Sequence, residues 1–99
     1  MVRLKWKIKW ERTLIGETKD YFVHDGMKFL SRDGLNMKYL KENGHHTNSD
    51  ELGQVNYYDI VVNDKVLKNG AWYYPDFKLH SREFKDFVTF SKDVNLSIV

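Results

Sequence analysis

The chain of 99 residues is long enough for one domain with a single apolar core, with 41% hydrophobic and 30% charged residues. It has no cysteine, which excludes disulfides, thiolate zinc sites and a cysteine nucleophile, and fits the reducing cytoplasm. No run approaches the roughly 20 apolar residues of a membrane span, and the N-terminus lacks the apolar core of a signal peptide. We therefore expect a cytoplasmic, sheet-rich domain without membrane contact, since 15% of the residues are aromatic.

Basic charge is concentrated at the N-terminus, although the net charge is only +2. Four basic residues precede the first acid, Glu11: Arg3, Lys5, Lys7 and Lys9. Four apolar residues alternate with them: Leu4, Trp6, Ile8 and Trp10. This period of two predicts a half-buried strand over residues 3–10, whose lysines keep a sheet edge unpaired. Nucleic-acid binding by this strand is the weakest functional hypothesis, because the tryptophan rings and the lysines lie on opposite faces of the strand and cannot bind one nucleic-acid strand together.

Two hairpins are predicted in the first third of the chain. Glu11-Arg12 connects the N-terminal strand to a strand over residues 13–17. A strand over residues 21–24 leads into Asp25-Gly26, the strongest short hairpin signal in the chain, because glycine adopts the positive φ of a primed turn. His24 lies beside this turn, and we interpret it as a surface residue rather than a ligand.

A polar segment over residues 42–53 is predicted to form a long loop. Before it, Ser31 is a candidate N-cap for a short helical turn. The residues between this turn and Asn43-Gly44 fit both a helical and an extended pattern, and Asn43-Gly44 ends them. Long polar loops in compact domains are often functional. The segment holds four groups that can ligate metals: His45, His46, Asp50 and Glu51. Adjacent histidines project differently and no spacing adds a third ligand in a known geometry, so we predict no metal site and no cofactor.

The second half of the chain again reads as strands. Residues 55–62 form the clearest buried strand, and Asn63-Asp64 turns it towards a partner that begins at residue 65. A bulge or tight turn is expected at 68–70. The strand over 71–74 must then end or lie at an edge, because Pro75, the chain's only proline, has no amide hydrogen for a ladder.

The C-terminal part completes the predicted sheet. Residues 77–82 are irregular, with Ser81 as a candidate cap of a short turn, and strands follow from Phe84 to Phe90 and over 94–99. The total of about eight short strands with one or two short helical turns predicts a mainly all-β domain. We expect a compact antiparallel β-barrel or sandwich over residues 1–99.

Four segments resemble the motifs of a known family. They read F-L-S-R-D-G-L-N-M-K-Y-L at 29–40, H-T-N-S-D-E-L-G-Q-V-N-Y-Y-D-I at 46–60, G-A-W-Y-Y-P-D-F at 70–77 and F-V-T-F at 87–90. In order and spacing they resemble Y-F-P-R-D-x-L-R-x-x-Y-L, H-T-x-C-P-x-K-G-x-A-x-Y-Y-x-V, A-A-W-Y-Y-P-D-P and Y-V-A-F of the domain-of-unknown-function 427 family. The resemblance covers nearly the whole chain.

The resemblance carries a nucleotidyltransferase label from some domain libraries, but this chain departs from the motif at three positions. Ser49, Asp50 and Leu52 stand where the family has cysteine, proline and lysine. A lysine in a glycine-bounded loop would neutralise a transferring phosphoryl group, which leucine cannot do. Phosphoryl chemistry through that lysine would therefore be lost or moved here. A glycine-serine nucleotide loop with spaced aspartates is also missing from the sequence.

Two functional hypotheses remain. The first is a module that binds a small molecule or nucleotide in an aromatic pocket lined by Thr47, Tyr57, Trp72 and Tyr74. Alternation buries either Trp72 with Tyr74 or Tyr73 alone, so these rings can equally belong to the core.

The second hypothesis is an enzyme, nucleotidyltransferase-like or other. It would use His46, the usual type of proton carrier near neutral pH, with Asp76 or Ser49 as its partner. No spacing in the sequence assembles these residues into a triad, and Asp76 after proline can instead cap backbone amides. The oligomeric state stays open, a homodimer included.

Overall fold

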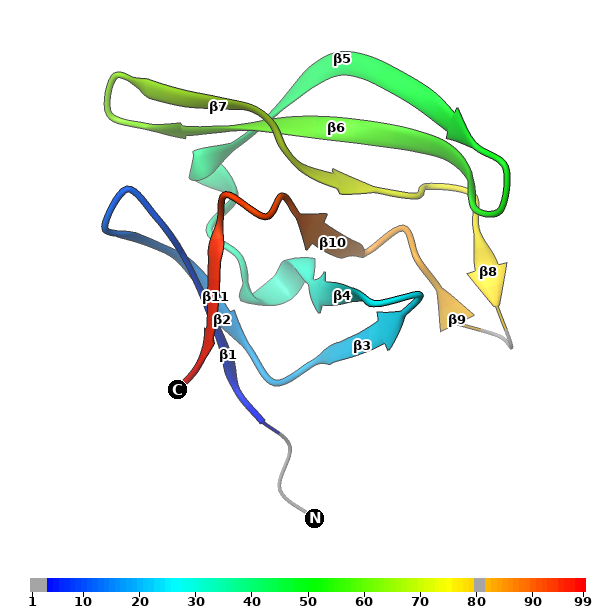
Figure 1. The fold of residues 1–99 in the computed structure, drawn as a ribbon, viewed down its shortest axis with the longest axis horizontal. Helices are drawn as coiled ribbons and strands as arrows, with labels where there is room; N and C mark the ends of the chain where they lie inside the picture. Colours follow the sequence, from blue (N-terminus) through cyan, green and yellow to red (C-terminus); the bar gives the residue numbers. More distant parts are fainter. Residues whose placement is uncertain (1–3, 80–81) are drawn as a thin grey trace.

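The structure is a computed structural model that describes residues 4–79 and 82–99 (Figure 1). In these residues it contains eleven strands: β1 Trp6–Trp10, β2 Thr13–Thr18, β3 Tyr21–His24, β4 Met27–Ser31, β5 Leu40–Ser49, β6 Gly53–Val62, β7 Lys65–Tyr73, β8 Lys78–Leu79, β9 Arg82–Glu83, β10 Phe87–Phe90 and β11 Asn95–Ile98. Two 3₁₀ turns, η1 Arg32–Gly34 and η2 Met37–Tyr39, separate β4 from β5. Neither of these turns has the length to cross a membrane.

The strands form antiparallel sheets. One sheet has three strands in the order β11-β1-β2, and a second has six in the order β3-β4-β10-β7-β6-β5. A small third sheet pairs β8 with β9. The prediction of a mainly all-β domain with one or two helical turns is confirmed, and the sheets do not close into a barrel. Figure 1 shows the three-stranded sheet beside one part of the larger sheet, an arrangement closer to a sandwich.

The N-terminal strand is central rather than at an edge, so that part of the sequence prediction is wrong. β1 pairs with β2 on one side and with the C-terminal β11 on the other, through partners such as Ile8↔Leu96. Ile8 is fully buried and Lys5 forms an ion pair with Glu17 at 2.9 Å. The pairing of the two chain ends is long-range, and alternation within one strand does not reveal it. Arg3 lies outside the described residues.

The predicted hairpin turns and the predicted Ser31 cap are confirmed. Asp25 and Gly26 have φ values of 51° and 77°, as a primed turn requires, and they join β3 to β4. Ser31 caps η1 by accepting a hydrogen bond from the Asp33 amide. In β7, the expected irregularity appears as a register shift opposite Asp59, between the pairs Tyr58↔Ala71 and Ile60↔Leu67. The strand then ends before Pro75.

The predicted polar loop over residues 42–53 is wrong. Residues 40–49 form the ten-residue edge strand β5, which pairs with β6, and only residues 50–52 turn between them. Nearly all β5 side chains are exposed, so the segment lacks the apolar alternation by which strands are recognised. The break at Asn43-Gly44 is a bulge inside the strand, where Gly44 has a φ of 78°.

The segment after Pro75 also differs from the prediction. Residues expected to be irregular contain the short pair β8–β9, and the strand expected from Phe84 begins at Phe87. Phe84 lies outside any strand and is buried. Ser81, the predicted cap, lies outside the described residues.

Two apolar clusters occupy opposite faces of the six-stranded sheet. Neighbouring residues alternate between them, as Phe29 with Leu30 and Tyr57 with Tyr58 illustrate. The inter-sheet cluster joins this sheet to the three-stranded sheet and consists of Ile8, Ile15, Leu30, Leu35, Leu40, Tyr58, Ile60, Val62, Ala71, Val88, Phe90 and Val94. The aromatic cluster on the other face is built on Phe29, Leu52, Val55, Tyr74 and Phe84, with Phe22, Met27, Tyr57, Trp72, Phe77 and Phe87 packed against it.

Backbone contacts also bring the two 3₁₀ turns against the three-stranded sheet. Gly16 forms a bridge with Leu35, and the Asn36 amide donates to the Ile15 carbonyl at 2.8 Å. A Cβ atom on Gly34 would lie 2.3 Å from the Glu17 carbonyl oxygen, so only glycine allows this approach. The segment between β4 and β5 is therefore held firmly, and β5 starts from a fixed point.

Candidate functional site

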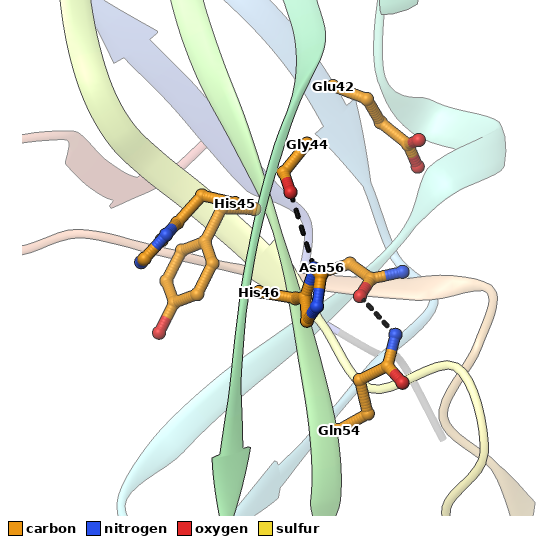
Figure 2. A pocket seen from close by; sticks show the side chains of 7 residues that line it. Glu42, Gly44, His45, His46, Gln54 and Asn56 are labelled. Atoms are coloured by element: carbon orange, nitrogen blue, oxygen red, sulfur yellow. Dashed lines mark hydrogen bonds between the residues drawn. The ribbon is translucent and has the colours of Figure 1, made fainter.

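A pocket of about 140 Å³ lies at the bulge of β5 (Figure 2). Its lining comes from β5 and β6 and consists of Glu42, Gly44, His45, His46, Gln54, Asn56 and Tyr57. The pocket combines two kinds of group. The rings of His45 and Tyr57, 4.9 Å apart, lie on one side of the β5–β6 pair, and the other side chains supply a carboxylate, an imidazole and two amides on the other side.

The bulge that forms the pocket is held by side chains. Register passes from Glu42↔Tyr58 to His46↔Asn56, so three residues of β5 stand opposite the single residue Tyr57. The Asn43 side chain accepts a hydrogen bond from the His45 amide at 2.8 Å. It also donates to Asp59 at 2.7 Å, which ties the bulge to β6.

Asp59 connects this bulge with the bulge of β7. Its Oδ1 accepts from the Asn69 amide at 3.0 Å as well as from Asn43. Burial would raise the pKa of Asp59, but the hydrogen bonds from Asn69 and Asn43 and the charge of Lys68 outweigh it, so the pKa is lowered. The two irregular strands on either side of β6 are thus joined through one carboxylate.

A chain of hydrogen bonds runs through the polar wall of the pocket. Gln54 Nε2 donates to Asn56 Oδ1 at 2.7 Å, and Asn56 Nδ2 donates to the Tyr73 hydroxyl at 3.3 Å. The Tyr73 hydroxyl donates in turn to the Glu42 carboxylate. Each donor in the chain has one acceptor, so the amides and the carboxylate are fixed in orientation. A wall of this kind is organised before any ligand arrives.

The Tyr73 ring contacts two side chains, Tyr58 and Arg32. The Tyr58 ring stacks on it with centroids 5.3 Å apart, and the Arg32 guanidinium carbon lies 5.1 Å from its centroid. Arg32 also donates from Nη2 to the Lys85 carbonyl at 2.9 Å. Burial raises the pKa of Tyr73, and the neighbouring Glu42 carboxylate raises it further against the opposing influence of Asn56 and Arg32. The phenol therefore remains a hydrogen-bond donor at neutral pH.

The predicted ligand-binding residues are brought together in part. The Thr47 and Tyr57 hydroxyls are 3.0 Å apart, and the Tyr57 and Trp72 rings are 6.1 Å apart on the face of the aromatic cluster. Tyr74 is separate from the pocket lining. It is 6% exposed, packs against Phe29, and donates its hydroxyl to the Met27 sulfur at 4.0 Å.

The three candidate catalytic residues lie in three different settings. His46 lines the pocket, and its Nδ1 is 3.3 Å from the Gly44 carbonyl oxygen. Ser49 caps the β5–β6 turn, because its hydroxyl accepts from the Leu52 amide at 3.1 Å. Asp76 lines a separate cavity of about 250 Å³ with Pro75, Phe77, Lys78, Glu83 and Lys85.

Sequence reasoning missed Glu42, Asn56 and Tyr73 as site residues. Glu42 was expected in a loop, where its pairing with Tyr58 on a strand could not be foreseen. The available signal was the alternation of Trp72-Tyr73-Tyr74, which places Tyr73 on the face opposite its neighbours. Leu52, which replaces the lysine of the family motif, is 3% exposed. Its side chain is buried in the aromatic cluster.

A family model described as Domain of unknown function (DUF427), which also carries the name NTP_transf_9, matches residues 3–99. The chain belongs to this family. No curated protein matches it significantly. In this DUF427 domain the pocket lining includes His46, Asn56 and Tyr57 from the motif segment at 46–60, and Asn56 donates to Tyr73 from the motif segment at 70–77.

Proposed function

We propose that this DUF427 domain binds a small uncharged molecule with a hydroxylated ring, of about the size of one sugar unit, in the pocket at the β5 bulge. The observation that carries the proposal is the hydrogen-bonded chain Gln54–Asn56–Tyr73–Glu42, which shares its side of the β5–β6 ladder with His46. Amides and a carboxylate that are fixed in orientation can form hydrogen bonds with several hydroxyl groups of one small ring.

The size and charge of the pocket favour a neutral fragment over a nucleotide. Its volume of about 140 Å³ is well below the roughly 300–1,000 Å³ of pockets that enclose drug-sized ligands. The lining formed by described residues includes the Glu42 carboxylate and no lysine or arginine, so a phosphate group would meet a like charge without a cation to balance it. A sugar or similar polyol is small enough for this volume and carries no negative charge.

An NMR titration of the ¹⁵N-labelled protein tests this proposal. The panel contains neutral monosaccharides, nucleosides, nucleotides and inorganic phosphate. We expect saturable shifts of the Gly44, Asn56 and Tyr57 amides with at least one neutral ring compound, and none with phosphate alone. Asn56→Ala should weaken the binding about fivefold, because a hydrogen bond is worth on the order of 1 kcal/mol.

Asp76→Asn is the matched control, because it changes a polar residue in the separate cavity. Its affinity should equal that of the wild type. Shifts that appear only at the Asp76 cavity, or no saturable shift with any neutral compound at millimolar concentration, would refute the proposal. Well-dispersed spectra of both variants establish that the fold is retained.

A second candidate function is acid–base catalysis by His46 on the bound molecule. One observation favours it: donation from His46 Nδ1 to the Gly44 carbonyl leaves Nε2 as the basic nitrogen of the neutral ring. Glu42 shares the pocket and would be its carboxylate partner, whereas Asp76 lines another cavity. Turnover of chromogenic glycoside or ester substrates that is abolished in His46→Gln and kept in Asp76→Asn supports this function. Equal rates in both variants contradict it.

A further inference from the structure

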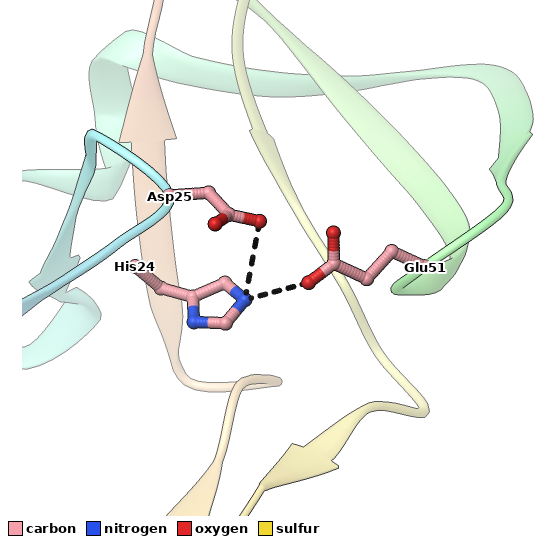
Figure 3. Close-up of side chains that lie close together, drawn as sticks. All are labelled: His24, Asp25 and Glu51. Carbon is pink, nitrogen blue, oxygen red and sulfur yellow. Dashed lines mark hydrogen bonds and ion pairs between the residues drawn. The ribbon is translucent and has the colours of Figure 1, made fainter.

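Three potential metal ligands, none of which lines the pocket, converge where the β3–β4 turn meets the β5–β6 turn (Figure 3). His24 ends β3, Asp25 follows in the β3–β4 turn, and Glu51 lies in the β5–β6 turn. His24 Nε2 is 3.2 Å from Glu51 Oε1 and 3.6 Å from Asp25 Oδ2. The three ligand atoms all lie within 4.8 Å of one another. Figure 3 shows both carboxylates directed at the same imidazole nitrogen.

We propose that His24, Asp25 and Glu51 bind one first-row divalent cation of the zinc type. Bonds of about 2.0–2.2 Å from zinc to nitrogen or oxygen place adjacent ligand atoms roughly 3.0–3.6 Å apart in tetrahedral or octahedral geometry. The two nitrogen–oxygen distances agree with this spacing, and a small rotation of either exposed carboxylate completes it. An imidazole ligand favours zinc and other first-row transition metals over magnesium and calcium, which prefer oxygen ligands alone.

The backbone on both sides of the site is held in place. The His24 ring meets Phe84 edge to face at 5.7 Å, and its side chain is only 20% exposed. Asp25 belongs to the tight primed turn with Gly26. On the other side, Ser49 accepts from the Glu51 amide at 3.3 Å, and buried Leu52 anchors the turn in the aromatic cluster. Little chain ordering is therefore required when a cation binds.

The charges at this corner are unbalanced without a cation. Two carboxylates face one imidazole nitrogen, and a single N–H there cannot form a full hydrogen bond with both. Among the described side chains, no lysine or arginine forms an ion pair with Asp25 or Glu51. A divalent cation would balance both carboxylates and take the lone pair of the deprotonated Nε2.

Such a site would connect the two edges of the six-stranded sheet. β3 and β5 are its outermost strands, and His24 and Glu51 come from β3 and from the turn that follows β5. Three protein ligands leave at least one coordination position for water or an exogenous ligand. The inference is independent of the proposed sugar pocket, because none of the three ligands lines that pocket.

Zinc titration of the full, tag-free chain tests the proposal by isothermal calorimetry and thermal unfolding. We expect one zinc ion per chain and a rise of the melting temperature with zinc, and no rise with an equal concentration of magnesium. Three variants should each weaken zinc binding at least about tenfold: His24→Phe, Asp25→Asn and Glu51→Gln. The substitutions are conservative, because phenylalanine keeps a ring against Phe84 and asparagine tolerates the left-handed turn.

Matched controls distinguish this site from other histidines. His45→Ala and His46→Ala should leave zinc binding unchanged, because both residues lie in the β5 pocket. The proposal fails if zinc does not bind in a saturable way, if binding survives in the Glu51→Gln and His24→Phe variants, or if it is lost in the His45 or His46 variants. Mn²⁺ added to the wild-type protein gives a readout that needs no variant: it should broaden amide signals at 24–26 and 50–52 first, and broadening elsewhere overturns the assignment.

Discussion

The two faces of the six-stranded sheet are buried in different ways. The face with the inter-sheet cluster, rich in isoleucine, leucine and valine, is covered by a second sheet through regular strand packing. The other face has a cluster of rings covered by short segments around β8 and β9, where Phe77 and Phe84 pack. The first face therefore depends on the pairing of whole strands, and the second on a few large side chains. Their sensitivity to substitution should differ accordingly.

The largest expected effect is on the aromatic face. Phe84 is 1% exposed and contacts the rings of Phe22, Phe29 and Phe77. Phe84→Ala should lower the free energy of unfolding by about 3–5 kcal/mol, because a cavity remains where the ring was. Urea denaturation measures this loss. Phe84→Leu, which refills most of the volume, should cost clearly less, and equal losses for the two variants would mean that ring packing does not hold this face.

A smaller effect is expected where the inter-sheet face meets the 3₁₀ turns. A methyl group on Gly34 would collide with the Glu17 backbone and the Thr18 side chain. Gly34→Ala should therefore cost about 1–3 kcal/mol, as is typical of overpacking. The measurement is again urea denaturation, with Gly26→Ala as a comparison in which strain comes from a positive φ without any steric contact. An unchanged stability in Gly34→Ala would show that η1 shifts away from β2 at little cost.

Asp59→Asn tests the link between the two bulges and should be milder, about 0.5–1 kcal/mol, because the carboxylate is accessible to solvent. The native pKa of Asp59 lies below its usual value of 3.8. Its stabilising contribution is therefore complete above the unfolded pKa and is lost as the pH falls through the lower native pKa. The stability difference between wild type and variant should be constant near pH 7 and vanish towards pH 2. A difference that persists in strong acid would contradict the role of the ionised carboxylate.

The smallest effect on stability is expected at the pocket. Tyr73→Phe removes the hydroxyl that joins Asn56 to Glu42 but keeps the ring contacts with Tyr58 and Arg32. We expect a loss below about 1 kcal/mol, the net worth of a partly exposed hydrogen bond. The raised pKa of Tyr73 provides a second measurement: absorbance titration should lose one late-ionising phenol above pH 10 in the variant. An unchanged titration would show that Tyr73 ionises like an exposed tyrosine.

Local signals predicted the regular parts of this fold well. Asp25-Gly26 specified a turn through the positive φ of glycine, and Ser31 specified a cap through its hydroxyl. The alternation of Trp72, Tyr73 and Tyr74 correctly gave two alternative faces, and the structure assigns Tyr73 to one and its neighbours to the other. These features depend on residues close together in sequence, where side-chain chemistry and backbone geometry are directly linked.

Features that depend on distant partners were missed. β5 has almost no buried side chain, and only its ladder to β6 makes it a strand. The central position of β1 comes from its pairing with β11 at the other end of the chain. At the candidate site, Thr47 and Tyr57 were anticipated together, but Glu42 and Tyr73 meet only because β5 and β7 pair with β6 on its two sides. The approach of His24 to Glu51 is of the same kind.

The bulge of β5 also has a consequence for solubility. An edge strand of ten residues presents a row of unpaired amide and carbonyl groups on which another chain could form a further strand. The extra residues at Asn43, Gly44 and His45 break the regular spacing of that row near its middle. A straight incoming strand can match the groups on one side of the bulge but not on both. The irregularity that shapes the pocket therefore also protects the domain against edge-to-edge aggregation.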